Sequence, residues 1–243
     1  MIPESLTKDQ DAQKRAAAES AAALVENGMV VGLGTGSTAA FAVSALAQRV
    51  REGLRIVGIP TSERTAAQAR ELGIPLTTWA EHAEIDMTID GADEIELGTL
   101  HLIKGHGGAL LREKIVATAS KRLVIIADET KLVERLGLRT TIPVEVIPFG
   151  WEVTARRLQN AGAKVELRRA EDDQPFISDG GHYILHCAFS PEASAEALAE
   201  ALDRTVGVVE HGLFLGMTSE ARVAATAGVR VFTAAGTRRG GRD

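Results

Sequence analysis

The stretch that decides the fold is Met29-Val30-Val31-Gly32-Leu33, followed at once by Gly34-Thr35-Gly36-Ser37-Thr38. The first part is a short apolar run bounded by glycine, typical of a buried strand, and residues 37–51 then predict a helix with Ser and Thr at its start. A strand that turns through glycines directly into a helix indicates a βα unit. Backbone N–H groups at such a helix start favour an anion site, whereas the plainer interpretation is a tight turn with a capped helix.

The same alternation continues along most of the chain. Further strands are expected at 55–59, 74–76, 87–90, 100–103 and 122–127, and further helices at 8–26, 62–72 and 109–120. This predicts an α/β fold with a mostly parallel sheet. After about residue 138 we expect strands at 143–148, 164–169 and 182–188 and helices at 151–160 and 194–203, an order that predicts a smaller second α/β unit with an antiparallel sheet. The last strands, at 212–216 and 229–232, are expected to return to the first sheet.

Composition limits the class of protein. The chain has 243 residues, of which 45% are hydrophobic and 25% charged, and its net charge of −6 argues against general nucleic-acid binding. We find no apolar run of membrane-spanning length and no secretion signal, and therefore expect a cytoplasmic protein. The single cysteine, Cys187, excludes an intrachain disulfide, and its apolar neighbours predict a buried packing thiol. Residues 236–243 predict a disordered basic tail.

Asp90-Gly91-Ala92-Asp93-Glu94 is an acidic turn directly after the apolar run 87–89. Asp90 and Asp93 lie three residues apart, so both can face one crevice at the carboxyl end of a strand, where α/β proteins bind small ligands. The acids of this turn also fit a divalent metal site, and a lone turn of this kind is most often only solvated. The neighbouring Lys104 favours a ligand site.

The second charged segment is Lys104-Gly105-His106-Gly107-Gly108-Ala109-Leu110-Leu111-Arg112-Glu113-Lys114. Its glycines expose backbone N–H groups, and a helix is expected to begin at Ala109. Glu113 falls in the second turn of this helix, on the same face as Ala109. A partly buried carboxylate there, with a raised pKa, is a candidate general base for a substrate C–H proton. The alternative is a surface Arg-Glu-Lys triplet in which Glu113 is solvated.

The glycine loop at 32–38 matches neither common nucleotide-binding motif in full. It is not a Walker loop, because no Gly-Lys-Ser/Thr follows, and Ala39 stands where the dinucleotide fingerprint usually has its third glycine. A dinucleotide-binding oxidoreductase is therefore the weakest interpretation. The six histidines have no metal-site spacing, and neither a metal nor a cofactor is expected. Lys14 and Lys131 are ambiguous from spacing alone.

Taken together, the motifs closely resemble those of the ribose-5-phosphate isomerase A family over nearly the whole chain. The resemblance rests on G-x-G-T-G-S-T-A at 32–39, T-S-x-R-T at 61–65, D-G-A-D-E-I at 90–95, K-G-x-G-G-A-L-x-R-E-K at 104–114, A-D-x-x-K at 127–131, P-V-E-V-I-P at 143–148 and G-L-F at 212–214. It implies a metal-independent aldose–ketose isomerase of the pentose phosphate pathway, which interconverts ribose 5-phosphate and ribulose 5-phosphate.

The resemblance also implies a domain organisation. A Rossmann-like domain at 1–137 and 213–243 would carry the site, and a smaller inserted domain at 138–212, ferredoxin-like in its element order, would contribute part of an oligomer interface. The implied assembly is a homodimer or a homotetramer.

Each site residue takes a role from the resemblance. Glu113 would move a proton between C2 and C1 of the sugar through a cis-enediolate, and Lys104 would stabilise the developing oxyanion. Asp90 and Asp93 would hold the sugar hydroxyls and assist ring opening. The other residues expected at the substrate are Thr35, Gly36, Ser37, Thr38, Lys131 and Lys14, mainly at the phosphate, and Gly91, Ala92, Gly105, His106, Gly107 and Gly108.

Three features depart from the family pattern. His106 stands where the family has Gly or Arg, and His186 stands where an Asp is expected. The segment from Asp93 to Lys104 is one residue longer than in some relatives. None of these changes removes a proposed catalytic group, although the change at His186 bears on the expected subunit interface.

Two other functions compete with the isomerase. The effector domain of a DeoR-type repressor, a non-catalytic sugar-phosphate sensor, has a similar fold and acidic glycine turn. Only one helix is expected before Val30, which leaves no room for a helix-turn-helix DNA reader, and the intact spacing of Lys104 and Glu113 favours catalysis. A coenzyme A transferase-like enzyme would use Glu113 as a nucleophile, but the short phosphate loop favours a smaller ligand.

Overall fold

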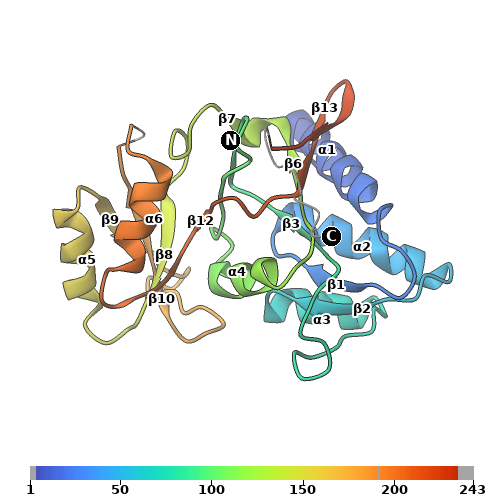
Figure 1. Cartoon of the computed structure of the whole chain (residues 1–243), viewed down its shortest axis with the longest axis horizontal. Coiled ribbons are helices and arrows are strands. Elements are labelled where there is room, and N and C mark those ends of the chain that lie inside the picture. Colours follow the sequence, from blue (N-terminus) through green and yellow to red (C-terminus); the bar gives the residue numbers. More distant parts are fainter. Residues whose placement is uncertain (1–3, 191, 235–243) are drawn as a thin grey trace, which may run out of the picture.

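The structure, a computed structural model of the chain, describes residues 4–190 and 192–234, so the tail expected at 236–243 lies outside the described residues. Figure 1 shows two bodies of secondary structure, the larger on the right and the smaller on the left. The helices are α1 (Glu4–Ala22), α2 (Ser37–Arg51), α3 (Glu63–Glu71) and α4 (Leu110–Thr118), then α5 (Trp151–Asn160) and α6 (Ala195–Asp203) in the smaller body. None of the described helices is long and apolar enough to cross a membrane.

A six-stranded sheet forms the centre of the larger body. Its strands, in spatial order, are β14 (Gly228–Phe232), β13 (Glu220–Ala225), β6 (Leu123–Asp128), β3 (Met87–Gly91), β1 (Val30–Leu33) and β2 (Val57–Pro60). All neighbours pair in parallel except β13 and β14. The predicted α/β fold with a mostly parallel sheet is therefore confirmed, and the last two strands lie at its edge.

Helices cover both faces of this sheet because the residues of β1 alternate between two apolar layers. Val31 and Leu33 belong to the cluster packed against α1 and α2, whereas Val30 packs with Val116 of α4 on the other face. Gly32 lies where α4 approaches most closely, and a Cβ there would collide with Thr88 and Val116. The missing side chain at Gly32 thus lets α4, the helix that carries Glu113, lie directly on the sheet.

Several elements differ from the prediction, among them β13, which was not expected at all. The helix expected at 8–26 begins at Glu4 and ends at Ala22, after which the chain closes with tighter i→i−3 hydrogen bonds from Leu24 and Val25. The strand expected at 74–76 is reduced to a single bridge between Gly58 and Leu76, because Pro75 has no N–H to continue a ladder.

An antiparallel sheet forms the smaller body, as predicted. Its order is β11 (Val208–His211), β8 (Ile142–Val146), β10 (Tyr183–Ala188) and β9 (Lys164–Leu167). Val144, Leu185 and Cys187 are fully buried in its core, beneath α5 and α6. Burial raises the pKa of the Cys187 thiol to about 12, so it behaves as the packing residue that its neighbours predicted.

A third, small sheet connects the two bodies and carries both charged segments. It contains β12 (Leu213–Phe214), β5 (Leu102–Ile103), β4 (Glu94–Glu96) and β7 (Leu132–Val133). Since β12 pairs with β5, residues 212–214 do not return to the six-stranded sheet as expected. The acidic turn enters this sheet through β4, and Lys104 follows β5 directly. The short ladders β12–β5 and β4–β5 thereby place the two motifs next to each other.

Candidate active site

A pocket of about 220 Å³ opens at the carboxyl edge of the parallel strands. The glycine loop follows β1, the acidic turn begins with the last two residues of β3, and Lys131 lies in the 3-10 turn after β6 (η1, Glu129–Lys131). Parallel strands bring these loops to the same edge, so residues about a hundred positions apart become neighbours. The lining residues are Gln10, Lys14, Thr35, Gly36, Ser37, Thr38, Gly91, Ala92, Asp93, Lys104, Gly105, Gly107, Glu113, Asp128 and Lys131. Gln10 and Asp128 were not predicted: Gln10 belongs to no motif, and of the motif at 127–131 only Lys131 was expected at the substrate.

Three buried charged groups meet at the floor of this pocket. Lys104 Nζ lies 2.9 Å from Asp90 Oδ2 and 3.6 Å from Glu113 Oε2. It also donates a hydrogen bond of 2.6 Å to the carbonyl of Gly91. Burial works against the charged ammonium, but the carboxylates outweigh it, and the pKa of Lys104 lies above its ordinary value. Lys104 is therefore a fixed cation in a dry site.

Glu113 is the group of this cluster that is poised to exchange a proton. Burial, which outweighs the attraction of Lys104, raises the pKa of Glu113 to about 8, and the charges of Asp90 and Asp93 contribute. Its buried Oε2 has no hydrogen-bond partner among the described residues, and Glu113 is one of the residues that line the pocket. A carboxyl with a pKa near neutrality, next to a cation, suits general acid–base catalysis.

Asp90 has a different environment although it belongs to the same cluster. Burial raises its pKa, whereas Lys104 and the backbone N–H groups of Gly91 and Thr35 favour its charged form. A Cβ at Gly34 would collide with Asp90, so only glycine fits between the loop and this carboxylate. Gly34 is a site residue that our prediction missed, although the Gly-Thr-Gly spacing contained the signal.

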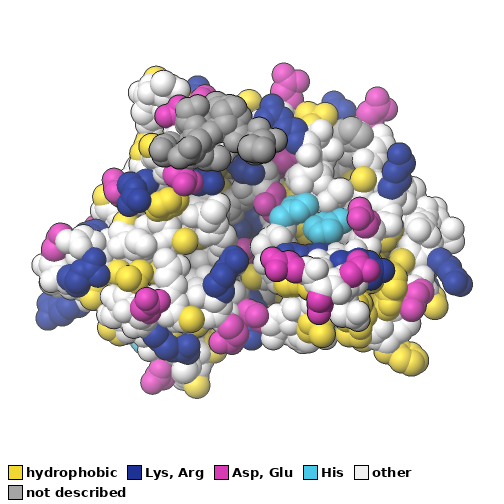
Figure 2. Space-filling view, turned by 180° about the vertical axis from the view of Figure 1, so that it is seen from behind, with side chains coloured by type: hydrophobic (Ala, Val, Ile, Leu, Met, Phe, Trp, Pro, Cys, Tyr) yellow, Lys and Arg dark blue, Asp and Glu magenta, His cyan; other side chains and the backbone are white. Residues whose placement is uncertain are grey.

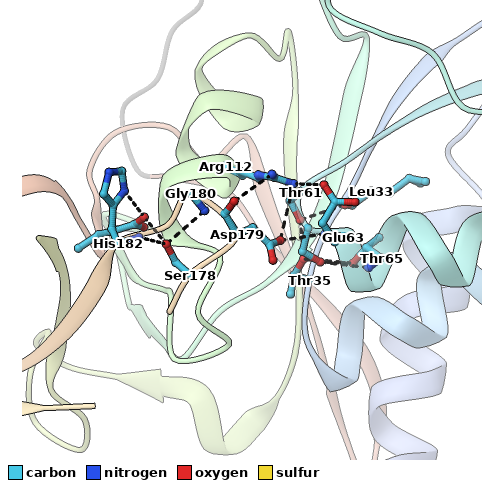
Figure 3. A network of polar contacts seen from close by, with 12 residues as sticks. Leu33, Thr35, Thr61, Glu63, Thr65, Arg112, Ser178, Asp179, Gly180 and His182 are labelled. Carbon is cyan, nitrogen blue, oxygen red and sulfur yellow. Dashed lines mark hydrogen bonds and ion pairs between the residues drawn. The ribbon is translucent and has the colours of Figure 1, made fainter. Parts of the chain in front are cut away.

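The hydroxyl of Thr35 anchors the glycine loop to neighbouring hydroxyl groups of the protein. Its hydroxyl lies 2.7 Å from that of Thr61, 2.8 Å from that of Ser62 and 3.1 Å from that of Thr65 (Figure 3). The hydroxyls of Thr61 and Thr65 each donate a hydrogen bond to a backbone carbonyl at the end of β1, and the hydroxyl of Ser62 donates to that of Thr65. The oxygen of Ser62 is therefore the acceptor for the hydroxyl proton of Thr35. The hydroxyl of Thr35 is thus fully engaged in the protein, although Thr35 is one of the residues that line the pocket.

The expected capping of α2 by Ser37 and Thr38 is wrong. Gly36 occupies the N-cap position with φ 119°, and no side chain caps the helix. This φ lies in the region that favours glycine. Within the described part of the chain, neither the Ser37 nor the Thr38 hydroxyl makes a hydrogen bond to protein, and both line the pocket with the helix start. Free hydroxyls and N–H groups at a helix N-terminus form a ready anion site.

Lys14 and Lys131 line the same pocket. Lys14 comes from α1 and lies 3.6 Å from the exposed Asp11, its partner one turn earlier. Lys131 ends the 3-10 turn that the carboxylate of Asp128 caps. The structure therefore brings both lysines, whose roles were ambiguous from spacing, to the pocket that also holds Ser37.

The acids of the turn serve different partners. Asp90 pairs with Lys104, and Asp93 accepts a hydrogen bond of 3.1 Å from the backbone N–H of His106. Glu94 is buried and accepts backbone N–H groups from the loop that leads to β8, those of Gly137, Arg139 and Thr140 at 2.6, 2.6 and 2.9 Å. Their carboxylates do not converge on one point, so the acidic turn is not arranged as a metal site.

His106 lies at the edge of the site rather than in it. It lines a hollow beside the pocket, together with Asp93 and Lys131, which line both. Its ring stacks on that of His186, so the two histidines that depart from the family pattern touch each other. Two neighbouring histidine side chains are visible at the surface in Figure 2, bordered by acidic and basic groups.

Two ionic networks hold the helix that carries Glu113. Arg112 of α4 pairs with Glu63 of α3 at 2.8 Å and donates to the carbonyl of Asp179 in the smaller body, as Figure 3 shows. Two residues further along α4, Lys114 Nζ lies 2.6 Å from both Glu210 Oε1 and the carbonyl of His211. These contacts fix α4 between the two bodies, and sequence spacing gave no signal for them.

A larger cavity of about 300 Å³ lies elsewhere, between α6 and the loop before β8. Leu136, Cys187 and Leu198 are among its lining residues, and it contains none of the residues expected at the substrate. Size alone therefore does not identify the site, whereas the chemistry of the smaller pocket does.

Comparison with known proteins agrees with this geometry. The model of the family described as ribose 5-phosphate isomerase A (phosphoriboisomerase A) matches residues 57–228. The chain belongs to the ribose 5-phosphate isomerase A family. The ribose-5-phosphate isomerase A of Gloeobacter violaceus is 63% identical over 225 residues, which cover 93% of this chain and 97% of that protein.

Solved isomerase structures are similar over almost the whole chain. The ribose 5-phosphate isomerase A of Methanocaldococcus jannaschii has a TM-score of 0.88 and 40% identity, covering 92% of this chain and 99% of the other. A D-ribose-5-phosphate isomerase in complex with phospho-erythronic acid has a TM-score of 0.89 and 35% identity, with the same coverage. Neither these relatives nor the site of this family member favours a sugar-phosphate sensor or a coenzyme A transferase.

Proposed function

We propose that this chain catalyses the reversible interconversion of D-ribose 5-phosphate and D-ribulose 5-phosphate, a step of the non-oxidative pentose phosphate pathway. The observation that carries the proposal is the buried Glu113 carboxyl 3.6 Å from Lys104, inside a pocket with a free helix start. Membership of the isomerase family supports the same reaction. The complex of a relative with phospho-erythronic acid supports a sugar-phosphate ligand.

Glu113 acts as the base. In the open-chain aldose its carboxylate takes the proton from C2, the electron pair forms the C1–C2 double bond, and negative charge develops on O1. Lys104 stabilises this oxyanion as a fixed cation, which needs no reorganisation when the charge forms. The O2 proton passes to O1, Glu113 returns its proton to C1, and C2 becomes the ketone. The net change is one hydrogen moved from C2 to C1 and one from O2 to O1, so no external oxidant is required.

Asp90 and Asp93 bind the sugar. Asp93 lines the pocket with Lys104 and Glu113, whereas Asp90 is not among the lining residues and lies against Lys104 at 2.9 Å. We assign the two carboxylates to the hydroxyls and to ring opening. Asp93 is the more accessible of the two, because Asp90 is 1% exposed and already engaged by Lys104. The backbones of Gly91, Ala92, Gly105 and Gly107 line the same wall, where the lack of large side chains leaves room for the sugar.

The phosphate occupies the other end of the pocket. Gly36, Ser37 and Thr38 offer backbone N–H groups and two hydroxyls, and Lys14 and Lys131 supply positive charge. This combination complements a dianion. The N–H of Thr35 donates to Asp90, so the phosphate loop and the catalytic carboxylate are directly connected.

We also propose the two-domain division, at 1–137 with 213–243 and at 138–212, and a homo-oligomer assembled partly through the smaller domain. Large apolar side chains there are exposed, Phe149 by 95% and Val206 by 72%. Exposed apolar groups of this size favour a protein contact. Light scattering of the purified protein, with Phe149→Ser beside it, tests this assembly; a monomer in both samples would contradict it. The cytoplasmic location and the lack of a nucleic-acid partner stay predictions from composition.

The deciding experiment measures ketose formation from ribose 5-phosphate by purified, chelator-treated protein. Glu113→Gln should retain ligand binding and lose most turnover, whereas the exposed Glu71→Gln on α3 serves as the matched control and should retain it. No activity in the wild type, with ribose 5-phosphate still raising the melting temperature, would favour the sensor. Wild-type turnover in Glu113→Gln would remove Glu113 as the base.

A further inference from the structure

The peptide that binds Asp93 has little stiffness of its own. The backbone N–H of His106 donates to Asp93 Oδ2 at 3.1 Å. His106 stands between Gly105 and Gly107, and Gly105 has a φ of 108°, a conformation that favours glycine. Glycines leave the backbone many alternatives, so a well-directed N–H at this position requires anchors from outside the segment.

His106 is anchored from several directions. Its Nε2 lies 2.7 Å from Thr140 Oγ1 and 3.0 Å from the carbonyl of Thr141, and since a carbonyl only accepts, Nε2 carries the proton. Its own carbonyl accepts a hydrogen bond of 2.8 Å from Arg168 Nη1. Its ring stacks on the ring of His186, with centroids 4.8 Å apart and planes inclined by 22°.

One ring of the stack, that of His186, is uncharged. Burial, together with the neighbouring His106 and Arg168 and against the opposing charge of Asp93, lowers the pKa of His186 to about 4. His186 is therefore neutral throughout the range in which the enzyme is expected to work. Because a neutral ring avoids repulsion with Arg168, it can pack flat against His106.

We infer that His186 is a positioning residue for the isomerase reaction: its ring holds His106 in place, and the N–H of His106 holds Asp93 toward the sugar. The inference rests on the proposed function, in which Asp93 touches the substrate. It gives the smaller body a part in the reaction, although no described residue of 138–212 lines the pocket. His186 of β10 contacts the ring of His106, and the backbone N–H of His106 contacts the carboxylate of Asp93.

A double-mutant cycle tests this connection, with kcat and KM measured for the wild type, His186→Ala, Asp93→Asn and the double variant. We expect His186→Ala to lower kcat/KM roughly tenfold, the scale of one weakened hydrogen bond to a charged group. In the Asp93→Asn background the same change should cost less than about twofold, because the carboxylate that it positions is gone.

A conservative variant tests whether the flat ring of His186, and not its hydrogen-bonding nitrogen, is the part that positions His106. His186→Phe keeps a flat neutral ring but loses the contact of Nδ1 with Thr141 Oγ1, and it should stay within about twofold of the wild type. His101→Ala removes a half-buried histidine that faces Glu96 and Glu196 instead, and should leave kcat/KM unchanged. Where His186→Ala does not fold, His186→Leu, which fills space without a ring, takes its place in the cycle.

The outcomes distinguish the inference from the function on which it rests. A wild type without isomerase activity refutes the proposed function itself. An active wild type with an unimpaired Asp93→Asn variant overturns the inference, since Asp93 would then need no positioning. Equal losses from His186→Ala in both backgrounds, or no rescue by His186→Phe, also overturn it, because the residue would then act only on overall stability.

Discussion

Lowering the pH through 8 should slow the isomerase by protonating its base. Burial, opposed by Lys104, raises the pKa of Glu113 to about 8. Only the ionised carboxylate can take the C2 proton, so kcat/KM should follow the ionised fraction of the free enzyme. That fraction is about one half at pH 8, about one tenth at pH 7 and about one hundredth at pH 6. We therefore expect roughly a fivefold loss between pH 8 and pH 7.

The assay is the initial rate of ketose formation at low substrate concentration between pH 7 and pH 9. The second pKa of a phosphate ester is about 6, so the substrate is mostly a dianion throughout this window. Asp90→Asn removes a negative charge that raises the pKa of Glu113, and the midpoint should move to lower pH by roughly one unit, whatever the residual rate. Glu71→Gln, as a control of equal charge change, should leave the midpoint in place.

A profile that stays flat from pH 9 to pH 7 would refute the reasoning, because the ionised fraction of a base with a pKa near 8 falls about tenfold over this range and the rate should fall with it. An unmoved midpoint in Asp90→Asn would refute the coupling of the two carboxylates, and the identity of the base would then remain open.

Four further results follow from the same geometry. The pKa of Glu113 rises from 4.5 to about 8 on folding, so the native state holds a proton that the unfolded chain releases, and the free energy of unfolding falls as the pH rises through this range. In urea titrations at pH 9, Glu113→Gln should therefore be more stable than the wild type by roughly 2–4 kcal/mol. The difference should shrink at pH 5. Exhaustive EDTA treatment should leave turnover intact; a loss that Mg²⁺ or Mn²⁺ restores would make the acidic turn a metal site. Lys131→Met should raise KM for ribose 5-phosphate roughly tenfold with kcat little changed, since it removes one charge from the phosphate end; a fall in kcat alone would place Lys131 elsewhere. Gly34→Ala should cost at least tenfold in kcat/KM because the new Cβ displaces Asp90, and an unchanged rate would show that the loop moves freely.

Much of the site could be predicted because its residues stand at strand ends. The apolar runs before Gly34, Asp90 and Lys104 are short and sharply bounded, which indicated strands. The parallel order of the first two places their ends at one edge, whereas Lys104 reaches the same place through the antiparallel pairing of β4 and β5. Glycine in each following segment indicated close backbone approach. From these local signals, the fold class and most of the residues that line the pocket could be predicted.

Side-chain direction could not be predicted in the same way. Thr35 was expected at the phosphate, yet its hydroxyl is engaged by Thr61, Ser62 and Thr65. Glu94 belongs to the acidic turn, yet its carboxylate accepts hydrogen bonds from the loop before β8 and is not part of the pocket. In both cases the partner lies more than twenty residues away, and nothing in the local sequence specifies it.

The sequence by itself determined the order of strands and helices, the glycine loops and the residue types of the site, since all of these depend on apolar periodicity and on conformations that only a few residues adopt. The tertiary structure alone decided that Lys104 lies 2.9 Å from Asp90 and 3.6 Å from Glu113, and that His106 stacks on His186. The physical reason is that burial and charge interactions depend on distance in space: the pKa of Glu113 reaches about 8 only when the folded chain removes it from water and surrounds it with these neighbours.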